Sequence, residues 1–267
     1  DVTNQNNYGY IAWAWDAGAN SNKTYTVKVV SDSGNKYRFD DFGTSAVTLD
    51  LEEGGTYVFD QSDSSNSGHP IRFGTSANGT DYTTGVTHTG TPGSAGAKTT
   101  LVLGTGVATL YYSCANHSGM GGQINTNSTA GASNFDGSIQ STVRANASAG
   151  FSIVSWTCNG STNQTIGHGL NATPEFIIFK NRDRATNWTV LHKDATTTTQ
   201  KVFYLNTTGA VADYSGGSST WWNALPTSSV FSVGDTGTAV NHTNGDDMIT
   251  YCFTPVAGYS AFGSYTG

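Results

Sequence analysis

Three side chains of the types that bind copper lie within one short segment of the sequence. Cys114, His117 and Met120 have the spacing Cys-x-x-His-x-x-Met. They offer a thiolate, an imidazole and a thioether, which are the ligand types that select copper. A type-1 copper centre needs a second imidazole, and His69 in an earlier polar loop is the candidate. The sequence therefore predicts a site with Cys114, His69 and His117 in a trigonal plane and Met120 as the weak axial ligand.

The elements that must position these donors are β-strands. Helical periodicity is nearly absent, and short apolar runs bounded by Gly, Asn and Asp recur about every ten residues, which predicts an all-β sandwich architecture. The run before Cys114 leads into a glycine-rich turn, where the donors can turn inward. The expected strands are residues 25–30, 37–39, 47–51, 56–59, 71–73, 99–103, 108–113, 151–156, 175–180, 188–192, 202–205, 230–233 and 248–253.

Two segments resemble the cupredoxin family. Residues 53–73 read EGGTYVFDQSDSSNSGHPIRF and residues 110–124 read LYYSCANHSGMGGQI. They are similar to the family's strand with Gly-x-Thr-x-x-Phe, its polar loop ending in the first His, and its Cys-His-Met loop. The resemblance covers about residues 23–125 and implies a cupredoxin-like Greek-key β-sandwich that binds copper. Pro70 follows the first His, where blue-copper proteins often carry an Asn that holds the loops together. A vestigial site that keeps its thiol and thioether without a metal is the alternative.

The second half resembles an uncharacterised β-domain that recurs in structural proteins of marine tailed phages. The resemblance is carried by FDGSIQSTVRANASAGFSIVSW at 135–156, TIGHGLNATPEFIIFKNRDRATNWTVLHK at 165–193, WWNALPTSSVFSVG at 221–234, and the final segment from 244. It implies a second, jelly-roll-like β-sandwich and no active site.

Residues 10–18, YIAWAWDAG, resemble the lead-in that such phage domains carry. We therefore expect the cupredoxin-like module, 23–125, to be inserted into a phage-type domain made of residues 1–22 and 126–267. Residues 125–134 are small and polar and are the best candidate for a linker. The insertion predicts that residues 11–15 pair with or pack on residues after 135, in the same chain or in a neighbouring subunit, because two exposed Trp side chains on a free arm would be costly.

Composition excludes several classes of partner and reaction. A net charge of −7 and a pI of about 5.1 argue against nucleic acid. No apolar run approaches the ~18 residues of a membrane helix, so no membrane insertion is expected. The sequence has no P-loop, no dinucleotide-binding glycine motif, no nucleophile elbow and no His-Glu-x-x-His. We therefore predict that the chain is not an enzyme.

The favoured function is that of a non-enzymatic virion structural protein, a segment of a phage head or tail fibre or decoration. It would lie on the virion surface, outside the cell, for display or host-surface attachment. Its expected partners are other virion subunits, in a homo-oligomer, with host surface or glycan as a further contact. The alternatives are a copper electron-transfer cupredoxin fused to a second domain, and a cell-surface adhesin.

Other chemistry-bearing residues have simpler interpretations. Trp188, Tyr214, Trp221 and Trp222 could form a sugar-stacking platform, but aromatic side chains also fill thin sandwich cores, and the core is favoured. Cys158 and Cys252 lie on expected strands, and a disulfide between them is left open. His168 lies in a Gly-His-Gly turn and is not expected to bind metal.

Overall fold

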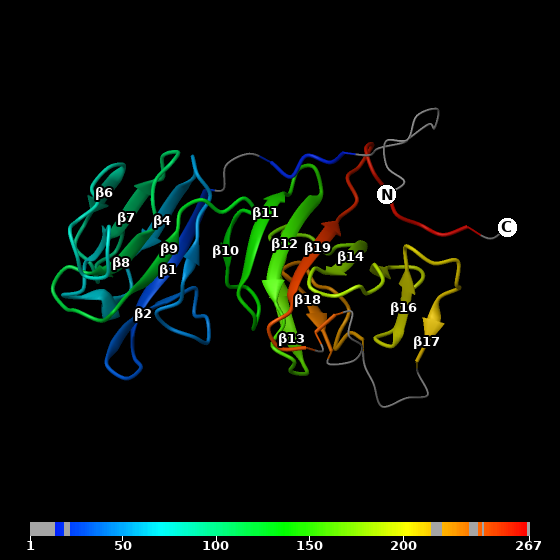
Figure 1. Ribbon diagram of the computed structural model, residues 1–267. Helices are drawn as coiled ribbons and strands as arrows, with labels where there is room; N and C mark the ends of the chain where they lie inside the picture. The colour runs from blue at the N-terminus through cyan, green and yellow to red at the C-terminus, as the bar shows by residue number, and fades with distance from the viewer. Residues whose placement is uncertain (1–13, 19–21, 215–220, 235–239, 242, 266–267) are drawn as a thin grey trace.

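The secondary structure is almost entirely β (Figure 1). The only helical element among the residues described is a three-residue 3-10 turn, η1 (Ser64–Asn66). No helix in that part of the chain is long and apolar enough to cross a membrane. The all-β prediction is therefore confirmed. The structure is a computed structural model, and it describes residues 14–18, 22–214, 221–234, 240–241 and 243–265.

Two facing sheets form the N-terminal sandwich. The five-stranded sheet has the order β2-β1-β4-β7-β6, and the four-stranded sheet has the order β3-β9-β8-β5. β1 pairs with β4 in parallel, as does β3 with β9. The strands are β1 (Asn22–Ser31), β2 (Asn35–Phe39), β3 (Leu49–Asp50), β4 (Thr56–Asp60), β5 (Ile71–Gly74), β6 (Val86–Thr89), β7 (Lys98–Val102), β8 (Leu110–Cys114) and β9 (Gly122–Asn125).

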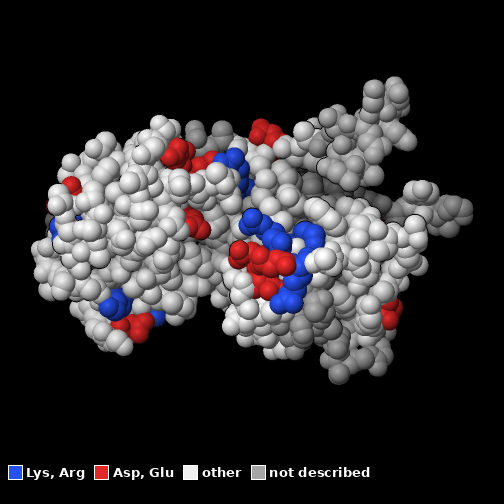
Figure 2. Space-filling view, viewed as in Figure 1, with Lys and Arg blue, Asp and Glu red and all other residues white. Residues whose placement is uncertain are grey.

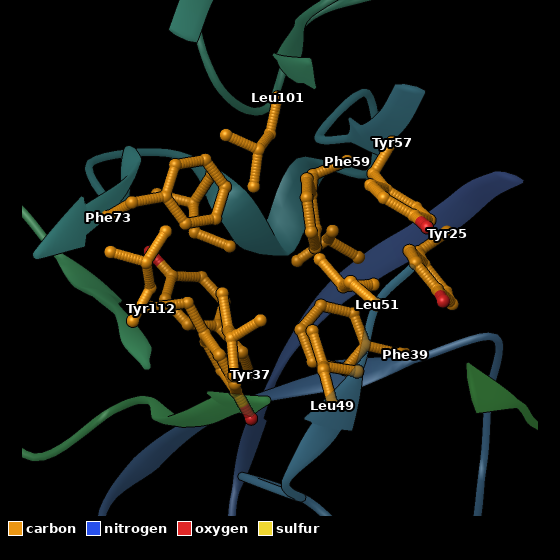
Figure 3. Close-up of a cluster of buried hydrophobic side chains, with 14 of the residues drawn as sticks. Tyr25, Tyr37, Phe39, Leu49, Leu51, Tyr57, Phe59, Phe73, Leu101 and Tyr112 are labelled. Atoms are coloured by element: carbon orange, nitrogen blue, oxygen red, sulfur yellow. The ribbon is translucent and has the colours of Figure 1, made fainter. Parts of the chain in front are cut away.

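Aromatic side chains from both sheets fill the space between them (Figure 3). Phe39 of the five-stranded sheet lies edge-on to Tyr112 of the four-stranded sheet, with ring centroids 5.1 Å apart. Phe59 and Phe73 also meet across the two sheets, with tilted rings whose centroids are 5.2 Å apart. Alternate residues of each strand point inward, so these rings interlock into one closely packed core. The loops that follow β4 and β8 are attached to strands of this packed core.

The C-terminal half is built on an eight-stranded sheet of order β10-β11-β12-β19-β14-β15-β16-β17. A two-stranded sheet, β13-β18, packs on one of its faces, where Phe231 meets Trp156 and Phe179. The strands are β10 (Ala132–Asn134), β11 (Ser141–Asn146), β12 (Phe151–Thr157), β13 (Gln164–Gly167), β14 (Phe176–Asn181), β15 (Thr189–His192), β16 (Lys201–Tyr204), β17 (Ala212–Asp213), β18 (Val230–Val233) and β19 (Asp247–Phe253).

Polar contacts join the two halves, which lie side by side in Figure 1. The Thr142 hydroxyl donates to Oδ2 of Asp50 at 2.6 Å. The Tyr25 hydroxyl donates to the carbonyl of Ser133 at 3.0 Å. Arg144 on β11 forms an ion pair with Glu52, a residue that is largely buried. These contacts hold the C-terminal half firmly against the N-terminal sandwich.

The small polar side chains of residues 125–134 predict a linker, but the structure has strand residues at both ends of this segment. Asn125 ends β9, and residues 132–134 form β10, whose three residues are all buried. The Ser133 hydroxyl accepts a hydrogen bond from the backbone N–H of Asp50 at 2.8 Å. A small polar residue suits this position because the two halves approach closely and the Ser133 hydroxyl satisfies a backbone N–H across the contact.

Trp15 packs on the C-terminal half. Its ring lies 5.2 Å from that of Phe253 and 6.2 Å from that of Phe151. Phe151 and Phe253 are directly opposed in the β12–β19 ladder, and Trp15 covers them on the outer face of the sheet. Residues 11–13 lie outside the described residues, so the packing predicted for them stays a prediction, as does the insertion itself.

The other aromatic and cysteine residues have structural surroundings. Trp221 and Trp222 are buried, so the core interpretation of this pair is confirmed. Trp188 and Tyr214 are 36% and 40% exposed, and for them the core interpretation is wrong. The three cysteines, Cys114 among them, are free, so Cys158 and Cys252 form no disulfide here.

Candidate metal centre

Cys114 is the last residue of β8, and the alternation of that strand points its side chain inward. Leu110 and Tyr112, at the preceding positions of the same parity, are buried in the core, and Cys114 itself is 2% exposed. The sulfur atom therefore lies at the end of the hydrophobic core, where β8 gives way to a loop.

The strand register brings His69 to this sulfur. Ile71 of β5 is directly opposite Cys114 in the antiparallel β5–β8 pair. His69 lies two residues before Ile71, the first residue of β5. Because alternate residues of a strand point to the same side, His69 lies on the inward side just before β5 begins. Nδ1 of His69 is 3.7 Å from Sγ of Cys114.

The loop after β8 supplies the third donor. Nδ1 of His117 lies 3.6 Å from Sγ of Cys114, and the rings of His69 and His117 are 4.6 Å apart. Donor atoms of the three residues all lie within 4.8 Å of one another, and this is the only such group of His, Cys, Asp or Glu found among the described residues. The structure thus brings together three of the four ligands that the sequence predicts.

Met120, the predicted fourth ligand, is 1% exposed and belongs to the core cluster. Its carbonyl accepts a hydrogen bond from the backbone N–H of Tyr37 at 2.9 Å. Two glycines allow this tight return of the loop. Gly119 has a φ of +75°, and a Cβ on Gly121 would lie 1.7 Å from the carbonyl oxygen of Tyr112.

Hydrogen bonds tie the His69 loop to the Cys114 loop without the Asn that the sequence comparison expects after the first His. The backbone N–H of Ala115 donates to the carbonyl of Pro70 at 2.9 Å. The side-chain amide of Asn116 donates to the carbonyl of Gly68 at 2.9 Å, while its backbone N–H donates to Sγ of Cys114 at 3.4 Å. The loop of Cys114 therefore provides the link between the loops that Pro70 cannot.

The protonation of the site favours metal binding. Burial lowers the pKa of His69, and the neighbouring His117 lowers it further. The neutral imidazole, which is the metal-binding form, is therefore the dominant form near pH 7. Burial, with the neighbouring Cys114 as the second cause, raises the pKa of the Tyr37 hydroxyl well above its usual range, so Tyr37 stays a proton donor.

The donor set fits a metal ion of the expected kind. Three donors in a plane, each about 2.1 Å from a central ion, lie about 3.6 Å from one another. The distances from Sγ of Cys114 to the two imidazole nitrogens, 3.6 and 3.7 Å, match that spacing, and all three donor atoms lie within 4.8 Å of one another. One thiolate and two imidazoles, with a thioether nearby in the chain, are the ligands of type-1 copper.

Two residues at the site were not singled out by the sequence. The Tyr37 hydroxyl and the side-chain amide of Gln61 both donate to the carbonyl of His69, at 2.8 and 2.9 Å. Both side chains are buried. The strand pattern of residues 37–39 indicates that the Tyr37 side chain points inward. Gln61 lies in a polar segment whose sequence gives no indication that its side chain is buried.

Comparison with known proteins gives one family. Residues 123–267 match the model of a domain of unknown function, DUF7483. That range contains the region in which the sequence resembles the phage β-domain, while no cupredoxin or phage-protein family is matched. No curated protein and no solved structure matches the chain.

Proposed function

This chain belongs to the family of DUF7483, a domain of unknown function, and we propose that it is a non-enzymatic virion component whose N-terminal sandwich binds one copper ion. His69, Cys114 and His117 would hold the ion, with Met120 as the axial ligand. The observation that carries the copper part is the clustering of one thiol and two imidazoles within 4.8 Å.

The surroundings of the donors support a metal site over a set of packed polar groups. The buried Cys114 sulfur already accepts a hydrogen bond from the backbone N–H of Asn116. The two imidazoles beside it are therefore not required as hydrogen-bond partners for the sulfur. His117 is exposed and His69 is partly exposed, so an ion could enter from the surface. When bound, copper supplies one-electron redox chemistry; the residues of the chain hold it, orient the imidazoles and exclude water from the sulfur.

The virion part rests on the resemblance of the second half to phage structural domains and on the surface. Figure 2 shows a surface that is largely uncharged on the face in view, with one patch where acidic and basic side chains adjoin, separate acidic side chains elsewhere, and no extended basic area. Such a sparsely charged polar surface suits a protein displayed outside the cell. Exposed Trp188 and Tyr214 offer aromatic surface for a glycan or another subunit.

Two measurements test this proposal. Metal analysis of the purified chain after exposure to equal Cu(II) and Zn(II) should give one copper per chain; zinc alone, or no metal, would contradict the copper part. Immunogold labelling of the culture that produces this chain, host cells and released phage particles together, should mark the head or tail surface of the particles. Label confined to the host cell would contradict the virion part.

A second function, electron transfer by a copper domain fused to DUF7483, is favoured by one observation. His117 is exposed while Cys114 is buried, so one ligand would connect the ion to the surface. Fast, reversible electron exchange with a soluble redox partner would favour this function over structural display.

A further inference from the structure

We propose that Gln61, together with Tyr37, is a positioning residue that fixes His69 before any metal binds. The inference rests on the proposed copper function. Gln61 directly follows β4 of the five-stranded sheet, whereas His69 precedes β5 of the facing four-stranded sheet. Its side chain therefore connects the two layers of the sandwich at the metal site.

The Gln61 amide pairs with the backbone on both sides of Pro70. Nε2 donates to the carbonyl of His69 at 2.9 Å, and Oε1 accepts from the backbone N–H of Ile71 at 3.2 Å. In an extended chain the carbonyl of one residue and the N–H of the second residue after it point to the same side, where a neighbouring strand would pair with both. The side chain of Gln61 takes the place of that strand, next to a proline that offers no N–H of its own.

Gln61 can do this because its own position is fixed. It is 1% exposed, its backbone N–H donates to Ala97, and its carbonyl accepts from Gly93, both at 2.8 Å. The reverse orientation of the amide would set its NH₂ group against the N–H of Ile71, two donors facing each other. The orientation is thus determined by the backbone around it.

Three successive carbonyls of the His69 loop are held by separate donors. Asn116 donates to Gly68 and Ala115 donates to Pro70, both from the loop that carries the other ligands. The carbonyl of His69 receives its two donors, Gln61 and Tyr37, from the opposite sheet. Gln61 and Tyr37 thereby fix His69 relative to the opposite sheet, while Asn116 and Ala115 tie its loop to the Cys114 loop, so the position of His69 does not depend on a metal ion.

The test compares Gln61→Met with the wild-type chain and with Gln123→Met. Methionine keeps the length and the unbranched shape of glutamine without its polar contacts, which also include a hydrogen bond of 3.5 Å from the Thr99 hydroxyl to Oε1. Gln123 lies in β9 of the same sandwich and bonds to Asn125 instead of the His69 loop, so it is a matched control. Should Gln61→Met fail to fold, Tyr37→Phe removes the other donor to the same carbonyl and keeps the aromatic ring.

In the metal-free protein, Gln61→Met should speed hydrogen exchange of the Ile71 amide at least tenfold and broaden the NMR signals of the His69 ring, with no change for Gln123→Met. In the copper-loaded protein it should weaken Cu(II) binding by about tenfold to a hundredfold and shift the Cu(II) EPR hyperfine splitting. A residue that only stabilises the fold would lower the melting temperature and leave the hyperfine splitting unchanged.

The two proposals can fail separately. If the wild-type chain binds no copper, the proposed function is wrong, and the exchange and NMR measurements on the metal-free protein still decide the role of Gln61. A folded Gln61→Met protein with wild-type Ile71 exchange, His69 signals and copper spectrum would overturn the inference.

Discussion

Nδ1 of His69 lies 3.7 Å from Sγ of Cys114, although 45 positions separate the two residues in the chain. The reason is the register of β5 and β8, which sets Ile71 opposite Cys114. Strand pairing, together with the hydrogen bonds that hold the carbonyls of the His69 loop, creates this contact, so the donors meet before a metal ion is present. Copper would therefore bind to ligands that folding of the sandwich has already placed, so that little further ordering accompanies binding.

Replacement of Met120 should change the properties of bound copper and leave the fold intact. Met120→Leu conserves volume in the core and should cost less than about 1.5 kcal/mol of folding stability. Loss of the axial thioether should shift the reduction potential while the thiolate band remains. Met248→Leu is the control, since Met248 is equally buried but belongs to the core of the C-terminal half. Equal potentials for both variants, measured by redox titration, would remove Met120 from the ligand set.

The donor residues could be predicted from the sequence because their positions follow from simple rules. Cys114 and His117 share one loop, and the parity of β8 places the sulfur inward. His69 has the same parity as Ile71 at the start of β5. All thirteen strands expected from short apolar runs overlap strands of the structure, because an inward-facing apolar residue at every second position is a local signal.

The rest depends on contacts that no local pattern records. Gln61 looks like one more solvated residue in a polar loop, and only the backbone of Gly93 and Ala97 around it makes it a buried connector. The strands β6, β9, β10, β11, β13 and β17 were not predicted, since Thr, Ser, Asn and Gly make up at least half of each of them except β17, which has only two residues. In β10, close approach of the two halves of the chain replaces hydrophobic alternation as the reason for burial.

Trp15 should stabilise the C-terminal half. The ring is 44% exposed and covers Phe151 and Phe253, so Trp15→Ala should lower the free energy of unfolding by about 2 kcal/mol. Trp15→Phe retains an aromatic contact and should lose less than half of that. Urea unfolding followed by circular dichroism measures both. A loss below about 0.5 kcal/mol for Trp15→Ala would mean that the Trp15 ring does not stabilise this half.

Thr142 should hold the two halves together through Asp50. Thr142→Val keeps the shape and removes the hydroxyl that donates to Oδ2 of this carboxylate, which should cost about 2 kcal/mol because the acceptor is charged. The Thr157 hydroxyl also donates to a carboxylate, that of Asp247, but at an exposed position. Thr157→Val should therefore change stability by less than about 0.5 kcal/mol. Equal losses in denaturant titrations of the two variants would contradict this role for Thr142.

His168 should make the folded state sensitive to acid. It is fully buried; its Nε2 lies 3.2 Å from the carbonyl of Thr227, and its Nδ1 accepts from the backbone N–H of Leu170. These contacts fit the neutral ring, and burial, the largest cause, lowers the pKa of His168. The unfolded chain then binds a proton first as the pH falls below about 6.5, so stability is lost there at up to about 1.4 kcal/mol per pH unit.

His168→Gln removes this titrating group and should flatten the decline in stability below pH 6.5. Chemical unfolding at a series of pH values from 5 to 8, with the metal-free protein, measures the difference between the variant and the wild-type chain. Parallel curves for the two proteins would show that His168 does not contribute to acid sensitivity.

The most direct test of the copper site is a titration of the metal-free chain with Cu(II), followed by visible absorption. Coordination by the Cys114 thiolate, with His69 and His117, predicts an intense visible band that saturates at one copper per chain. Cys114→Ser should abolish that band, whereas Cys158→Ser, at a buried cysteine of the C-terminal half, should retain it. A colourless wild-type protein after copper loading, or a band that survives in Cys114→Ser, would contradict a copper–thiolate centre in this sandwich.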